Sequence, residues 1–347
     1  MRRCAVLAGC LGLLAGVPQG ARAQQDTEPE FDQLVAAFQR DYLTLGILLQ
    51  VVGDFQTERT FAGENGFTIA NARVRVTGQL DNGFGYLVQA NVAASPAILD
   101  AAARYRLSAA ATVQAGLFKA PFSREFLTGA GSIDFVNRSQ VVTALAPNRQ
   151  IGVQVAGRPG TGLVEYAVGA FNGNRYSAGG NDNDELLYAA RLGLWPSVAT
   201  GDRPNDRLEV ALNVAHSRDA SAPIGAGFIP SFAGTRTVYG GDVRWRRGRW
   251  LAAGEFIAAR LDFDPGPVLR PTGWHATAGY MLTRKSQVLA RWDALRPDGI
   301  GPDQDLLVLG YNLWPTRPTE LQVNYVIPTK GPGPDRHQLL VNLQVGF

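Results

Sequence analysis

Short segments of alternating apolar and polar residues follow one another through most of the chain, with turn-forming residues between them. The clearest segment is the last, where Leu339, Val341, Leu343 and Val345 alternate with mostly polar residues and the chain closes on Phe347. A period of two places these apolar side chains on one face of a β-strand. The pattern is typical of the closing strand of an outer-membrane β-barrel, and it also fits an edge strand of a soluble sheet.

The alternation predicts sixteen strands in all, an even number, as single-chain bacterial barrels require. Apart from the first 23 residues, no stretch approaches the roughly 18–20 apolar residues of a membrane helix. The predicted strands lie near residues 43–54, 66–79, 84–93, 98–107, 111–119, 150–157, 162–172, 185–195, 206–216, 235–247, 249–260, 272–282, 286–295, 304–314, 319–328 and 337–347.

The connections between these strands alternate between short and long, which a soluble β-sandwich has no reason to show. If the N-terminus is periplasmic, the short turns fall on the periplasmic side and the longer loops outside. Two connections depart from the trend, because 94–97 is short for an outer loop and 196–205 is long for a periplasmic turn. We therefore predict an all-β fold, a transmembrane antiparallel β-barrel of about 16 strands. The loops expected outside are 55–65, 120–149, 217–234, 261–271 and 329–336.

The N-terminus predicts export. Arg2 and Arg3 precede an apolar stretch, and a small-residue cleavage site ends at Ala23, so residues 1–23 are expected to be a signal peptide. A lipid on Cys10 is the alternative, although the apolar stretch before it is short. Residues 24–42 are expected to form a periplasmic segment with a short amphipathic helix, and residues 43–347 the barrel. The expected location is the outer membrane of a Gram-negative bacterium.

Charge placement predicts a water-filled interior. Removing the signal peptide leaves 30 basic residues against 30 acidic ones, so no overall field attracts nucleic acid. Arg73, Arg75, Arg104 and Arg106 alternate with apolar residues, and an arginine facing lipid at mid-membrane costs about 2–4 kcal/mol. These arginines are therefore expected to face inward as one basic patch that sets ion selectivity.

The longest predicted loop, residues 120–149, is too apolar for a free surface loop, so we expect it to fold into the barrel and narrow it. Lys119, Arg124 and Arg138 would then add positive charge at the constriction. Glu125 and Asp134 would form its acidic side, or would pin the loop to arginines of the wall.

Three segments at and around this loop resemble the phosphate-selective porin O/P family: GLFKAPFS at 116–123, DFVNRS at 134–139 and APNRQIGVQ at 146–154. The resemblance is firm over about residues 67–157. It implies a sixteen-stranded homotrimeric porin, embedded in outer-membrane lipid and lipopolysaccharide, that passes anions through a constriction made by the third extracellular loop. Asn137 stands where the family has Glu, and the mature chain holds few lysines, so a phosphate-specific site is not expected.

No catalytic group, metal site or cofactor is predicted. His216, His275 and His337 lie on separate segments without ligand spacing, and no nucleophile or phosphate-cradling motif is present. The expected function is a channel for passive diffusion of small anionic or polar solutes, with phosphate or polyphosphate among the candidates. The alternative is a structural or adhesive barrel whose lumen is plugged by the long loop.

Overall fold

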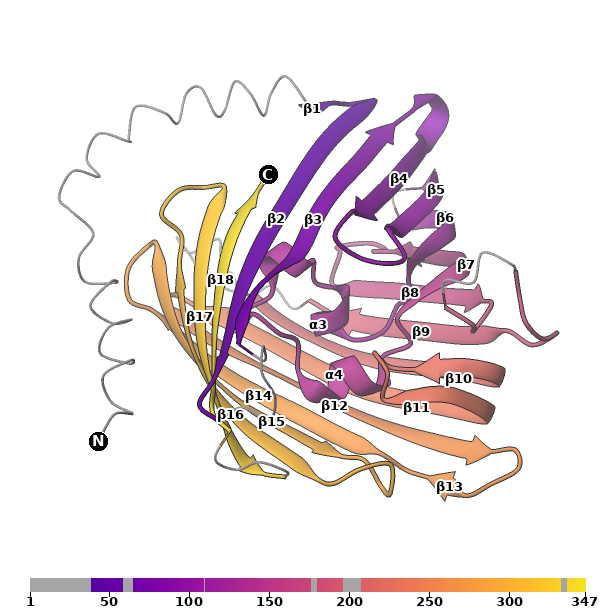
Figure 1. The fold of residues 1–347 in the computed structure, drawn as a ribbon. Coiled ribbons are helices and arrows are strands. Elements are labelled where there is room, and N and C mark those ends of the chain that lie inside the picture. The colour runs from indigo at the N-terminus through magenta and orange to yellow at the C-terminus, as the bar shows by residue number, and fades with distance from the viewer. Residues whose placement is uncertain (1–38, 59–64, 109, 176–179, 196–206, 332–335) are drawn as a thin grey trace, which may run out of the picture.

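The computed structural model is a closed antiparallel β-barrel with an inward-folded loop (Figure 1). The structure describes residues 39–58, 65–108, 110–175, 180–195, 207–331 and 336–347. Each wall strand pairs with the next along the chain, and β18 pairs with β2 to close the ring. None of the helices formed by these residues is long and apolar enough to cross a membrane.

Sixteen strands form the wall, as the sequence predicts. Two further short strands extend it: β1 (Gln39–Arg40) pairs with β2, and β13 (Val268–Leu269) pairs with β12. The wall strands are β2 (Leu43–Gln56), β3 (Gly66–Gln79), β4 (Phe84–Asn91), β5 (Ile98–Ser108), β6 (Ala111–Lys119), β7 (Arg149–Gly157), β8 (Val164–Phe171), β9 (Leu187–Leu194), β10 (Arg207–Ile224), β11 (Ile229–Arg247), β12 (Trp250–Phe263), β14 (Thr272–Met281), β15 (Ser286–Arg296), β16 (Gln304–Leu313), β17 (Thr319–Lys330) and β18 (Gln338–Gly346).

The two faces of the wall differ as the alternation predicts. In β10, Leu212 and Val214 are exposed on the outside of the barrel, whereas Glu209 and Asn213 are buried on the inside. Similar exposed apolar side chains recur around the ring, from Leu49 on β2 to Leu343 on β18. An apolar outer belt over a polar interior is the arrangement that a membrane barrel requires.

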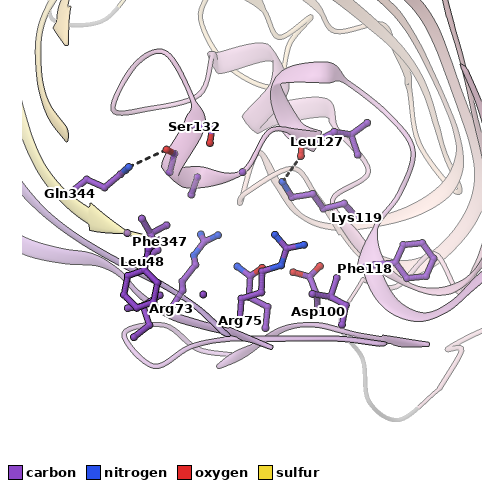
Figure 2. Close-up of a pocket in the computed structure, with 18 of the residues that line it drawn as sticks. Leu48, Arg73, Arg75, Asp100, Phe118, Lys119, Leu127, Ser132, Gln344 and Phe347 are labelled. Carbon is purple, nitrogen blue, oxygen red and sulfur yellow. Dashed lines mark hydrogen bonds between the residues drawn. The ribbon is translucent and has the colours of Figure 1, made fainter. Parts of the chain in front are cut away.

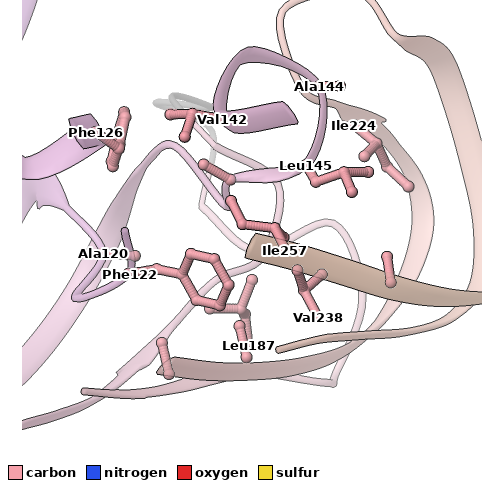
Figure 3. Close-up of a cluster of buried hydrophobic side chains, with 14 of the residues drawn as sticks. Ala120, Phe122, Phe126, Val142, Ala144, Leu145, Leu187, Ile224, Val238 and Ile257 are labelled. Carbon is pink, nitrogen blue, oxygen red and sulfur yellow. The ribbon is translucent and has the colours of Figure 1, made fainter. Parts of the chain in front are cut away.

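The connection between β6 and β7 lies inside the barrel and carries α3 (Arg124–Leu127), η3 (Ala130–Ser132) and α4 (Gln140–Leu145). Its apolar side chains pack on an apolar patch of the inner wall (Figure 3). Phe122 and Leu145 are fully buried there, beside Val238 and Ile257 from the wall. Burying each such side chain contributes about 1.5–3 kcal/mol, so this cluster anchors the base of the loop.

The prediction of an outer loop at residues 217–234 is wrong. β10 and β11 extend through most of this range and are joined by a short turn. Ala222 and Ile224 are buried in the hairpin, and the backbone N–H of Ala226 donates to the Thr143 carbonyl at 2.9 Å. Gly225 adopts φ 61°, and a Cβ there would lie 2.2 Å from the carbonyl oxygen of Ala144. Contact with α4, which local turn signals do not reveal, therefore extends this hairpin.

The predicted signal peptide, Cys10 and most of the predicted periplasmic segment at 24–42 lie outside the described residues. The described end of that segment contains the short strand β1. The helix predicted around Phe31 and Phe38 lies outside the described residues. β1 and the C-terminal end of β18 share the end of the barrel that carries the short turns (Figure 1). We call this the short-turn end, and we call the opposite end the long-loop end.

Candidate functional site

Two cavities lie on either side of the inward loop. The first, of about 600 Å³, faces the short-turn end and is lined by wall residues of β2 to β7, β17 and β18 and by residues of the loop; we call it the basic cavity. The second, of about 1000 Å³, opens toward the long-loop end and is called the outer vestibule. Arg73 on the wall and Ala130 on the loop line both cavities. These two residues therefore mark the neck between them.

Positive charge dominates the basic cavity. Figure 2 shows Arg73 and Arg75 projecting from β3 into the cavity. Arg104 of β5 lines the same space. Lys119, Arg149 and Arg317 also line it, and the acidic side chains in its lining are those of Asp100 and Glu320. Asp100 forms a bidentate ion pair with Arg149, with both contacts at 3.1 Å.

The strand register explains this grouping. Arg73 and Arg75 are two residues apart on β3, so their side chains share the inner face. Arg75 lies opposite Gln89 on β4, so a neutral amide stands on the strand between β3 and β5. Arg104 lies opposite Gln114 on the next strand, β6. Arg106 has the same phase as Arg104, but it is exposed beyond the cavity and does not line it.

Lys119 reaches the cavity because β6 ends there and the chain turns inward, as predicted for this position. Its Nζ donates to the carbonyl oxygens of Phe126, Leu127 and Thr128 at 2.5, 3.2 and 3.0 Å. Figure 2 shows the side chain extending from the wall to the loop. The ammonium group therefore binds the carbonyl groups at the end of α3, where a cation is also favoured by the helix dipole.

Replacing Lys119 by Met keeps the length of the side chain and removes all three hydrogen bonds. We expect the end of α3 to loosen, so single-channel recordings should show larger open-channel current noise than those of the unmodified protein. Arg75→Met removes a charge from the same cavity without removing a loop contact, and its noise should be unchanged. Equal noise in both variants would contradict the assignment of Lys119 as a loop contact.

Arg124 and Arg138 do not join the basic cavity, contrary to the sequence-based expectation. Arg124 pairs with Glu209 on β10, in a separate cavity of about 350 Å³ on the other side of the loop. Arg138 donates to the carbonyl oxygens of Glu125 and Thr128 at 3.1 and 2.7 Å and lies at the outer vestibule. A loop has no fixed period, so the sequence does not show which way its side chains point.

Glu125 and Asp134 both contact wall arginines. Asp134 forms a bidentate pair with Arg244, with contacts of 2.5 and 2.8 Å. Glu125 accepts hydrogen bonds from Ser139 N and Oγ at 2.9 and 2.6 Å, and from Arg291 at 3.3 Å. These contacts pin the loop to the wall.

Both loop carboxylates are held ionised. Burial raises the pKa of Glu125 and Asp134, but the neighbouring cations and hydrogen bonds outweigh it, so each pKa is lowered. A lowered folded-state pKa means that this stabilisation is present above the unfolded pKa. It is lost as the pH falls through the folded pKa values.

Side-chain amides of the wall bind the backbone of the next loop segment. Gln344 donates to the Gly131 carbonyl at 3.0 Å and Gln322 to the Ile133 carbonyl at 3.0 Å, while Asn324 accepts from Val136 N at 2.7 Å. The loop backbone thus has polar partners inside the barrel, as a buried segment requires. These partners lie on β17 and β18, whereas three arginines of the basic cavity lie on β3 and β5.

Sequence comparison identifies the family. The model described as phosphate-selective porin O and P matches residues 49–305, which is well over half of the chain. The chain belongs to this family. It is a porin of the Gram-negative outer membrane, and the family consists of channels for small solutes and not of enzymes. No curated protein sequence matches the chain.

Solved structures share the porin fold at low sequence identity. An anion-selective porin from Comamonas acidovorans is 12% identical, with a TM-score of 0.65, and the match covers 88% of this chain and 99% of that one. The trimer form of OmpT, an outer-membrane protein of Vibrio cholerae, is also 12% identical, with a TM-score of 0.62 and the same coverage. The outer-membrane channel DcaP of Acinetobacter baumannii is 10% identical, with a TM-score of 0.59 and coverage of 88% and 97%.

Two arginines of the basic cavity, Arg149 and Arg317, were not predicted from the sequence. Arg149 follows the loop directly and lies opposite Lys119 across the base of the loop. The alternation of β5 places Asp100, the partner of Arg149, on the inner face, and a buried carboxylate there indicates that a cation lies nearby. Arg317 lies in the turn before β17, where no alternation indicates its direction. Within the described residues, no three His, Cys, Asp or Glu side chains gather in a way that could hold a metal ion.

Proposed function

We propose that this porin conducts small anionic and polar solutes with a modest preference for anions. The observation that supports the proposal is the excess of positive charge along the open wall, from Arg73 at the neck to Arg75 and Arg104 below it. A solute entering at the long-loop end would cross the outer vestibule, pass Arg73 and leave through the basic cavity.

A few charges at a narrow passage can set ion preference although the total charge is close to zero. Low-dielectric walls focus the field, and a solute must pass close to the charged groups. Guanidinium groups match phosphate and carboxylate oxygens well. The ammonium of Lys119, however, is bound by loop carbonyls, and Arg149 is paired with Asp100. We therefore propose a broad anion preference, in which phosphate and polyphosphate are two of several solutes.

The surroundings are proposed on the same basis. The apolar outer belt suits outer-membrane lipid and lipopolysaccharide. A homotrimer is proposed because the similar OmpT structure from Vibrio cholerae is a trimer. The short-turn end would face the periplasm and the long-loop end the exterior.

Reversal potentials in planar bilayers test the proposal. With a tenfold KCl gradient at low salt, we expect the wild-type reversal potential to indicate that chloride permeates more readily than potassium. The preference should fade at higher salt, since the Debye length falls from about 10 Å at 0.1 M to about 3 Å at 1 M. A pore that favours potassium would contradict the anion preference. A properly assembled protein that does not conduct would instead support the structural barrel with a plugged lumen.

A further inference from the structure

The lumen wall carries an apolar strip at the outer vestibule, where the alternation of a porin strand places polar residues. Leu306 and Val308 on β16, Val326 on β17, Leu340 on β18 and Val52 on β2 all line this vestibule. Val308 lies directly opposite Val326 in the strand register. Leu340 lies opposite Asp54, two residues beyond Val52 along β2, so the strip continues around the ring.

Part of this strip supports the loop. Val308, Val326 and Leu340 are 3%, 9% and 3% exposed, and they pack in one cluster with Phe135 of the loop. Leu306, Val52 and Val136 of the loop pack against this cluster but are only partly buried, and all three line the vestibule. Packing against the loop therefore accounts for Val308, Val326 and Leu340. It does not account for the apolar surface of Leu306 and Val52 that faces the passage.

Charge lies beside the apolar strip. Arg73 stands at the neck below the vestibule, and Arg138 lies at its side. Of the two carboxylates in the lining, Asp293 contacts Arg291 at 3.4 Å, and Asp54 accepts two contacts of 2.8 Å from Gln338. An apolar wall with a few convergent polar groups, in a space of this size, is the usual composition of a small-molecule site.

We propose that the outer vestibule binds organic anions with an apolar body, such as an anionic group attached to an aromatic ring. The apolar body would lie on Leu306, Val52 and Val136, and the anionic group would point toward Arg73 at the neck. This proposal rests on the anion preference proposed above and specifies the class of anion that is favoured.

Phosphate and phenyl phosphate test the proposal, because they share an anionic head and differ only in the apolar ring. Each is added to one side of a planar bilayer that contains the purified porin, and its block of the chloride current is titrated. We expect phenyl phosphate to block at a concentration about tenfold lower, which corresponds to roughly 50 Å² of apolar surface removed from water. The difference should be larger from the long-loop side.

Two substitutions make the test specific. Leu306→Asn removes apolar surface from the vestibule, and Val52→Thr changes polarity at nearly constant shape in case the first variant assembles poorly. Each should reduce the preference for phenyl phosphate to about threefold or less, because about half of the apolar contact is lost. Leu127→Asn is the matched control, since Leu127 lines the basic cavity and not the vestibule. It should retain the wild-type preference.

The outcomes separate this inference from the proposed function. Equal block by both anions in the wild-type pore would overturn the inference, as would a preference that survives both vestibule substitutions. In either case, an anion-selective reversal potential would leave the proposed function intact. A cation-selective pore that neither anion blocks would overturn both proposals.

Discussion

Deleting residues 129–138 and joining the ends with two glycines should roughly double the single-channel conductance, because this segment is the part of the loop that crosses the lumen. It carries Ala130 at the neck and Gly131 and Ile133, whose carbonyls bind amides on β18 and β17. The deleted segment lies between α3 and α4, which contact each other, and Ser139 N donates to the carboxylate of Glu125 in α3 at 2.9 Å. Planar-bilayer recordings measure the change.

The rest of the loop should stay in place after this deletion. Phe122 and Leu145 remain in the apolar cluster, and Glu125 keeps its contact with Arg291. The barrel closes through hydrogen bonds between β18 and β2, which do not involve the loop. Asp134→Asn is a suitable control, because it weakens one ion pair while the segment remains, and its conductance should stay close to that of the wild type. If the deletion also left the conductance unchanged, the segment would not form the constriction.

The strands could be predicted from the sequence because each has two chemically different faces. Leu212 and Asn213 are adjacent in the chain and lie on opposite sides of the wall, and a similar contrast recurs in other strands that border lipid and water. The prediction failed beyond the membrane belt, where β10 and β11 continue as a hairpin over α4. There, the hydrogen bond between Ala226 and Thr143 holds the hairpin against α4. A local sequence pattern does not predict a contact between residues so far apart in the chain.

The candidate site could be predicted only in part, for the same reason. Arg73, Arg75 and Arg104 lie on strands, so their phase predicted that they face one space. Arg124 and Arg138 lie in the loop, where direction depends on tertiary partners such as Glu209 and the carbonyl of Thr128. The loop sequence showed that its apolar side chains must be buried. It could not show which wall strands they pack against, such as β11 and β12, which contribute Val238 and Ile257.

Changing Arg73 and Arg104 together to Ala should move the reversal potential from the anion side to or beyond zero. Both guanidinium groups line the basic cavity, and Arg73 also lines the vestibule, so the substitution removes charge from the neck and from the passage below it. Arg149 and Lys119 remain, but their charges are balanced by Asp100 and bound by loop carbonyls. The measurement is the reversal potential at low salt, where screening is weakest.

A control with equal charge loss shows whether position matters. Arg106→Ala combined with Arg247→Ala also removes two positive charges, but from exposed residues that do not line the basic cavity. If the field is local, this control should keep the anion preference, because charges farther away than a Debye length are screened. If both double variants shifted the potential equally, total charge would set the preference. If neither did, the selective groups would lie elsewhere, and Arg149 with its partner Asp100 would be the next pair to substitute.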